Sequence, residues 1–168
     1  WSARSVAFRA VSYVQLAELA LVGGDYLEAG RYARLAKDYD RNSLSANRLL
    51  AILARLGGDV VEWDRILSSI LELDPLHHFA EAELYLADVS TGENLVEGLR
   101  SEYPEQELLE FAIDYVELGR RDDAIALLEL GETGLRHPML RVWRAYLTED
   151  SGALDGGVNP DFVFPSRP

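Results

Sequence analysis

Apolar residues recur at helical spacing along most of this chain. Between residues 6 and 22 they return every three or four positions, which predicts an amphipathic helix over Val6–Val22. The same period continues in later segments that are separated by glycine, proline or short polar turns. We therefore predict an all-α protein. The further expected helices are Tyr26–Tyr39, Leu44–Leu56, Val60–Leu73, one from near His78 to about Thr91, Glu93 to about Glu102, Glu105–Leu118, Arg121 to about Leu130, and Pro138 to about Thr148.

The helical pattern repeats. The tripeptide Gly23-Gly24-Asp25 returns 34 residues later as Gly57-Gly58-Asp59, and the flanks repeat with it, so that Leu16-Ala17 corresponds to Leu50-Ala51. Self-similarity at a fixed period of about 20–50 residues is typical of repeat architectures. A single helical hairpin cannot bury its apolar face alone, so neighbouring hairpins stack. The sequence therefore predicts a stack of helix pairs that presents surface to a partner.

Composition narrows the class of partner. The 168-residue chain carries a net charge of −13 with a pI near 4.6. Because no basic stripe offsets the repulsion from phosphate, we predict that it binds neither nucleic acid nor an anionic membrane surface. Cysteine is absent, which excludes disulfides and thiolate metal sites and fits a cytoplasmic location. The chain opens at Trp1 without a signal-like segment, which predicts that it is part of a longer protein.

Two groups of residues carry side chains that could form a chemical site. His77 and Glu81 lie one helical turn apart, but His78 points elsewhere on a helix and no third metal ligand is evident. A run of carboxylates fits the N-terminus and solvent face of a helix better than an acid–base pair in a pocket. This run comprises Glu102, Glu105, Glu107, Glu110 and Asp114. We predict no metal, no cofactor and no catalytic residue in this chain.

The repeated positions resemble the tetratricopeptide repeat family over about residues 10–136. The family unit has a large residue, a leucine and a small residue in its first helix, a glycine at the turn, and small residues in the second. The matching residues are Tyr13, Leu16, Ala17, Gly24, Tyr26, Ala29, Ala36 and Asp40 in the first unit; Leu50, Ala51, Gly58, Asp74 and Pro75 in the second; Leu84, Tyr85 and Gly92 in the third; and Leu108, Phe111, Ala112, Tyr115, Gly119 and Ala124 in the fourth. Trp63 replaces the usual alanine of the second unit.

The resemblance implies an α-solenoid, a right-handed superhelix of antiparallel helix pairs. The implied units cover about residues 10–43, 44–77, 78–104 and 105–138, the third being degenerate, within a helical repeat domain of residues 1–150. A helix over residues 138–148 would cap the stack through Trp143 and Tyr146, or present a partner surface. Residues 151–168 are expected to form an irregular tail or linker.

The resemblance also implies a concave groove that binds protein or peptide segments. The groove residues expected from the register are Val11, Val14, Glu18, Leu21, Arg48, Ile52, Arg55, Phe79, Leu86, Leu109 and Ile113. Only Arg48 and Arg55 among them are basic, which argues against capture of a peptide's terminal carboxylate. An apolar groove of this kind is an exposed patch unless something covers it. Two alternatives are that tight curvature of the stack closes the groove, or that the register shifts after the third unit, so that other residues line it.

Three occupants of the groove are considered. One is the chain's own Phe162–Pro165, and the others are a neighbouring domain and a second subunit. The tail segment Asp161–Pro165 with Arg167-Pro168 is also similar to segments of large bacterial proteins that join a β-rich, carbohydrate-enzyme-like domain to such repeats. Our main prediction is a non-catalytic interaction scaffold. The alternative is an accessory repeat region of a larger bacterial carbohydrate-active enzyme.

Overall fold

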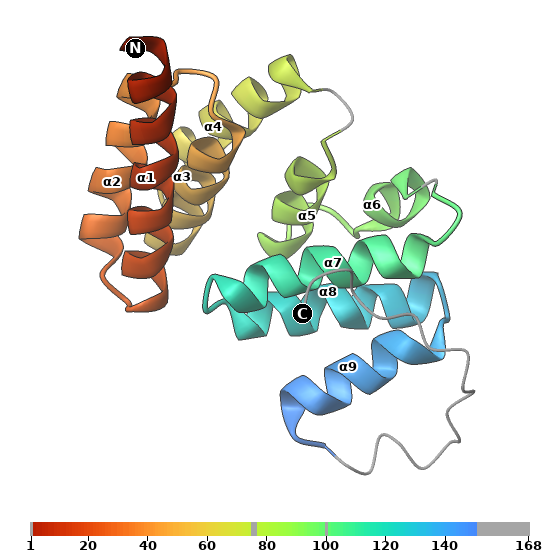
Figure 1. Ribbon diagram of the computed structural model, residues 1–168. Helices are drawn as coiled ribbons and strands as arrows, with labels where there is room; N and C mark the ends of the chain where they lie inside the picture. Colours follow the sequence, from red (N-terminus) through yellow and green to blue (C-terminus); the bar gives the residue numbers. More distant parts are fainter. Residues whose placement is uncertain (1, 75–76, 100, 151–168) are drawn as a thin grey trace. The chain divides into compact units, whose positions relative to one another are not determined.

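The structure is a computed structural model that describes residues 2–74, 77–99 and 101–150, and all regular structure in these ranges is helical (Figure 1). The all-α prediction is confirmed for this part of the chain. The chain divides into two compact units, residues 1–83 and residues 84–168, which are described separately below. None of the described helices is both long and apolar enough to cross a membrane.

Unit 1 consists of two complete helix pairs followed by the first residues of a fifth helix. Its helices are α1 (Ser2–Val22), α2 (Tyr26–Tyr39), α3 (Leu44–Gly57), α4 (Val60–Leu73) and the beginning of α5 (His78–Leu86). α1 packs on α2, α2 on α3, and α3 on α4. Sequence-adjacent helices are therefore also neighbours in space, as expected for successive hairpins with short turns.

The 34-residue period of the sequence is also a period of local geometry. Asp25 and Asp59 cap α2 and α4 with nearly equal backbone angles (φ −87°, ψ 75° and φ −83°, ψ 79°), and each side chain accepts a hydrogen bond from the amide three residues later. The C-cap residues that follow these helices are Asp40 and Asp74, again with similar angles (φ −139°, ψ 97° and φ −147°, ψ 95°). The glycine before each cap has a positive φ, which glycine adopts without steric cost.

The two helix pairs share this backbone but fill their interiors differently. In the first pair α2 contributes small residues, since Ala33 and Ala36 are fully buried, and Tyr13 of α1 stacks on two tyrosine rings of α2 at 6.2 and 5.6 Å between ring centroids. In the second pair the equivalent positions of α4 hold the larger side chains of Leu67 and Ile70, which are buried. Asn47 of α3 stands at the position that corresponds to Tyr13. Volume has thus moved from the first helix of the pair to the second.

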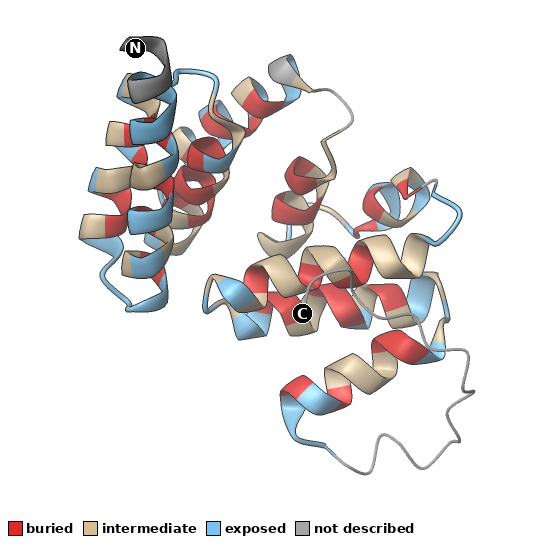
Figure 2. Ribbon diagram, viewed as in Figure 1, coloured by how far each residue is buried: buried red, intermediate tan, exposed pale blue. Residues whose placement is uncertain are grey.

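Unit 2 contains the rest of α5 and four more helices. They are α6 (Glu93–Gly98), α7 (Pro104–Glu117), α8 (Arg121–Gly134) and α9 (Pro138–Thr148). α7 and α8 form the third complete pair, and α9 packs on α8. Figure 2 shows buried residues along α7 and α8. Gly131 allows this close packing, because a Cβ atom there would lie 2.3 Å from Leu108 and 2.8 Å from Leu140.

Four predicted helix boundaries were wrong. α1 begins at Ser2, four residues before the expected start at Val6. The helix expected to reach Thr91 ends at Leu86, because Asp88 takes a left-handed conformation with φ 57°. The following helix stops at Gly98 after six residues, which leaves the degenerate third unit without a full-length pair. α8 runs to Gly134, four residues beyond the expected end. The tail that includes Phe162–Pro165 lies outside the described residues.

Candidate functional site

A cleft of about 360 Å³ lies on unit 1, between α1 and the turn that joins α2 to α3. It brings together three residues expected in the groove: Val11, Val14 and Glu18. The remaining lining residues are Ala7, Ala10, Gln15, Asp40, Ser43 and Ser45. The fourth groove residue expected from α1, Leu21, lies in the core with 3% of its surface exposed.

The cleft is apolar along α1 and polar at its other wall. Val11 is 57% exposed, so an apolar surface is open to solvent here. The turn contributes the hydroxyl of Ser43 and the carboxylate of Asp40, whose Oδ1 accepts a hydrogen bond from the amide of Asn42 at 3.1 Å, and the start of α3 contributes the hydroxyl of Ser45. Two carboxylates, from Glu18 and Asp40, and no basic side chain line the described cleft. Such a surface suits a segment that carries apolar side chains and positive charge.

Arg55, also expected in the groove, is engaged inside unit 1. Its guanidinium donates to both carboxylate oxygens of Glu83, with Nε–Oε2 at 2.8 Å and Nη2–Oε1 at 3.2 Å. The indole Nε1 of Trp63 donates to the same carboxylate at 3.2 Å. The Glu83 side chain is fully buried, and that of Arg55 is 12% exposed. This network therefore ties α3, α4 and α5 together.

The remaining groove residues of unit 1 are largely inside it. Ile52 and Phe79 are 1% and 0% exposed, so both contribute to the core. Arg48 lies over the Phe79 ring, with its Cζ 5.4 Å from the ring centroid, in the geometry of a cation–π contact. Burial of Ile52 and Phe79 and the ring contact of Arg48, rather than exposure in a groove, are what the structure shows at these three positions.

His77 immediately precedes α5, and its ring lies 6.2 Å from the Phe79 ring between centroids. Its Nδ1 accepts a hydrogen bond from the Phe79 amide at 3.3 Å. Burial, together with the nearby charge of Arg48, lowers the pKa of His77 below its ordinary value of 6.5. No group of three or more residues with metal-ligand side chains occurs in the described part of the chain, so His77 and Glu81 have no third ligand there.

The lowered pKa of His77 gives a prediction for stability. As the pH falls through about 6.5 the unfolded chain takes up a proton at His77 and the folded chain does not, so the free energy of unfolding decreases. We expect His77→Asn, which keeps an acceptor for the Phe79 amide, to flatten the decline of the melting temperature between about pH 7.5 and pH 5.5.

Thermal melting curves of wild type and variant at both pH values measure this change in melting temperature. His137→Asn is the matched control, since His137 caps α9 through the same kind of bond to Met139. Equal slopes for wild type and His77→Asn contradict the prediction.

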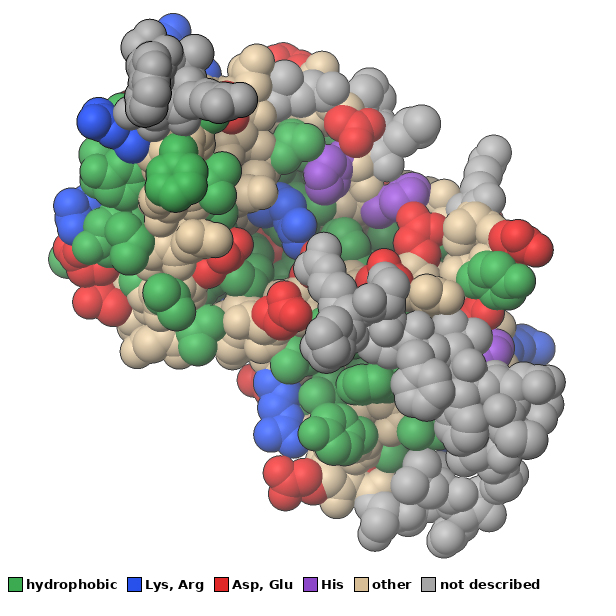
Figure 3. Space-filling model, viewed as in Figure 1, with side chains coloured by type: hydrophobic (Ala, Val, Ile, Leu, Met, Phe, Trp, Pro, Cys, Tyr) green, Lys and Arg blue, Asp and Glu red, His purple; other side chains and the backbone are tan. Residues whose placement is uncertain are grey.

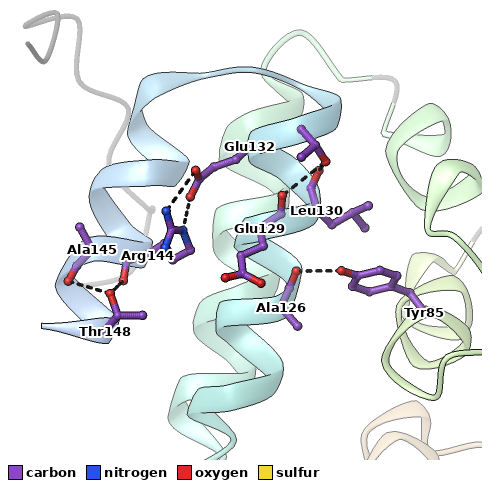
Figure 4. A network of polar contacts seen from close by, with 9 residues as sticks. Tyr85, Ala126, Glu129, Leu130, Glu132, Arg144, Ala145 and Thr148 are labelled. Atoms are coloured by element: carbon purple, nitrogen blue, oxygen red, sulfur yellow. Dashed lines mark hydrogen bonds and ion pairs between the residues drawn. The ribbon is translucent and has the colours of Figure 1, made fainter. Parts of the chain in front are cut away.

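Unit 2 places its expected groove residues on helices that are packed together. Leu109 is 1% exposed and belongs to the core, whereas Leu86 and Ile113 are half-buried. Polar contacts join the helices, as Figure 4 shows: the Tyr85 hydroxyl donates to the carbonyl of Ala126 at 3.3 Å, and Arg144 pairs with Glu132. Burial raises the pKa of Tyr85 above its ordinary value. These contacts hold the helices of unit 2 together.

Sequence reasoning missed Asp40, Ser43 and Gln15 as cleft residues. The sequence signal for the first two is the polar turn Asp40–Ser43 between two predicted helices. Comparison with protein-family models, curated protein sequences and solved structures gives no significant match.

Proposed function

We propose that this chain is a non-catalytic interaction module, in which the cleft on α1 docks a protein segment. The observation that carries the proposal is the composition of the cleft: an apolar wall containing the exposed Val11 lies opposite Asp40 and Ser43 of the turn and Ser45 of α3. Nothing in this arrangement pairs an activated nucleophile with a base, whereas an open apolar surface with a polar rim is typical of docking sites.

The ligand that fits best is an extended segment with an aliphatic or aromatic side chain next to a lysine or arginine. The apolar side chain would rest against Val11 and Val14, and its neighbour would approach the carboxylates of Glu18 and Asp40. Charge attraction of this kind speeds association and is weakened by salt. The tail residues Phe162, Phe164 and Arg167 have this chemistry in sequence, which keeps the chain's own tail among the occupants.

The wider architecture supports the proposal. The 34-residue period in caps and helix ends is what a tetratricopeptide-like solenoid requires, and such stacks present the first helix of each pair on one extended surface. We propose this solenoid organisation for the parent protein together with the docking function. α1 is the first helix of its pair, so its cleft lies on the surface that the resemblance assigns to binding.

A peptide-display experiment tests the docking function. The full chain is immobilised and panned against a library of random peptides, with Val11→Glu and Ser45→Arg as cleft variants and Val61→Glu as a control on α4, where Val61 is 82% exposed. We expect enriched peptides to combine apolar with basic residues, to include or resemble Phe162–Arg167, and to lose binding at least about tenfold with either cleft variant. The absence of enrichment, or equal binding to Val11→Glu and wild type, would contradict the proposal.

A further inference from the structure

Three tyrosines of unit 1 form a stack between α1 and α2. The ring of Tyr13, on α1, stacks on the rings of Tyr32 and Tyr39, on α2, with centroids 6.2 and 5.6 Å apart and interplanar angles of 23° and 14°. We call these three residues the tyrosine stack. All three are half-buried, so the stack reaches the surface. Figure 3, in which tyrosine is coloured with the hydrophobic residues, shows such side chains beside basic ones on the surface over α1 and α2.

The sequence sets the spacing of the tyrosine stack. Tyr32 and Tyr39 are seven residues apart, which is close to two helical turns, so they lie on one face of α2 about 10.5 Å apart along its axis. This separation leaves room for one aromatic ring between the two side chains. α1 packs on α2 and supplies that ring from Tyr13. Tyr13 therefore has a phenol on either side.

An arginine lies at each end of the tyrosine stack. Cζ of Arg9 is 5.7 Å from the centroid of the Tyr39 ring, and Cζ of Arg31 is 4.4 Å from that of the Tyr32 ring. Arg31 is itself held by the carboxylate of Glu28, with Nη2–Oε2 at 2.7 Å. A cation is attracted to the face of an aromatic ring at such distances. The two arginines therefore help to hold the outer rings in the stacked orientation.

Other readily oxidised side chains are missing or shielded. The chain has no cysteine, and its one methionine, Met139, is 4% exposed. In the described part of unit 1 the one tryptophan, Trp63, is 6% exposed and its indole donates to Glu83. A one-electron oxidant that reaches the surface between α1 and α2 therefore meets the half-buried phenols of the tyrosine stack.

We infer that one-electron oxidation of unit 1 joins Tyr13 to Tyr39 by a carbon–carbon bond. Each phenol gives one electron to the oxidant and one proton to water, and becomes a phenoxyl radical. The two radicals couple through the ring carbons next to the oxygens (Cε). The hydrogen on each of these carbons then moves to oxygen, which restores both phenols, so two electrons and two protons are lost in all. Tyr39 is the expected partner because its ring is nearer to that of Tyr13, and more nearly parallel to it, than the ring of Tyr32.

The bond would fasten two segments that form walls of the cleft. Tyr13 directly precedes Val14 of α1, and Tyr39 directly precedes Asp40 of the turn. A cross-link that closes a long loop stabilises a folded chain chiefly by restricting the unfolded one. The inference does not depend on the proposed docking function, because the cross-link is measured without a peptide.

Photo-oxidation of the full chain tests the inference. The chain is illuminated at low concentration with a ruthenium tris(bipyridine) complex and persulfate, and the products are sized, digested with trypsin and analysed by mass spectrometry. We expect a one-chain product that has lost two hydrogen atoms, shows dityrosine fluorescence and contains peptides joined at Tyr13 and Tyr39. Trypsin separates Tyr32 from Tyr39, because Arg34 and Lys37 lie between them, so the digest identifies the partner.

Phenylalanine variants provide the controls. Tyr13→Phe keeps an aromatic ring without a phenol and is expected to give no such product. Tyr26→Phe, on α2 at a site 48% exposed, and Tyr32→Phe are expected to give the same product as wild type. The absence of a one-chain product, a cross-link at any other pair of tyrosines, or an equal yield from Tyr13→Phe overturns the inference.

Thermal melting measures the effect of the cross-link on the fold. We expect oxidation to raise the melting temperature of the wild type by at least about 4 °C relative to equally oxidised Tyr13→Phe, which carries the same other oxidation products. Equal melting temperatures would overturn the stabilising role of the bond.

Discussion

Replacement of Glu83 by alanine is expected to destabilise unit 1 by about 3 kcal/mol, near the lower end of the range for breaking a buried ion pair. The reason is the guanidinium of Arg55, which is held by both oxygens of this carboxylate and is only 12% exposed. Without Glu83 its positive charge stays in the interior, and the indole N–H of Trp63 loses its acceptor as well.

Chemical denaturation followed by far-ultraviolet circular dichroism measures this loss. The double variant Arg55→Met/Glu83→Met is expected to be at least about 1 kcal/mol more stable than Glu83→Ala, because replacing the whole pair removes the unpaired charge. Glu72→Ala, at an exposed position of α4, is the surface control. If Glu83→Ala unfolds within about 0.5 kcal/mol of that control, the network is not a determinant of stability.

Truncation of Ile70 is the second large effect. Ile70 is fully buried in α4, and removing its side chain leaves a cavity, so we expect Ile70→Ala to cost about 2–5 kcal/mol. The equivalent residue of α2 is already alanine, Ala36, and the residue of α1 that corresponds to Asn47 is Tyr13, which stacks on two tyrosine rings of α2. Asn47→Tyr should therefore be much better tolerated in the Ile70→Ala background than in the wild type.

A double-mutant cycle on Asn47 and Ile70 measures this coupling. We expect the two changes to differ from additivity by at least about 1 kcal/mol, with the double variant more stable than the sum predicts. Asn47→Tyr combined with Leu127→Ala in unit 2 is the control, and this pair should be additive because the sites lie in separate units. If the two changes are additive within the cycle, the tyrosine at position 47 does not fill the cavity left by Ile70→Ala, and the prediction is contradicted.

The sequence was most informative where structure is set by neighbouring residues. α2, α4 and α9 have the predicted bounds, because a capping side chain or a proline at the first turn marks each start. The end of α5 was missed because it depends on the left-handed conformation of Asp88, and aspartate adopts that conformation only in particular surroundings.

The candidate site was predicted less well, for a reason visible at Arg55. Its helical register suggests an exposed position, but its partner Glu83 lies 28 residues further along the chain, on another helix. No local pattern shows that pairing. By contrast, Val11, Val14 and Glu18 share one face of a single helix, and the structure brings them together in the cleft. Asp40 joins them through a turn whose direction is a property of the folded chain.

The matching backbone angles at Asp40 and Asp74 mean that the chain leaves α2 and α4 in nearly the same local direction. The segment from residue 41 to Asp74 therefore follows and ends with C-cap residues of nearly the same backbone conformation. A duplication or deletion of this 34-residue segment would therefore join helices through a turn that starts from the same backbone conformation. The length of this kind of protein is then free to change in whole modules, while each junction keeps its shape.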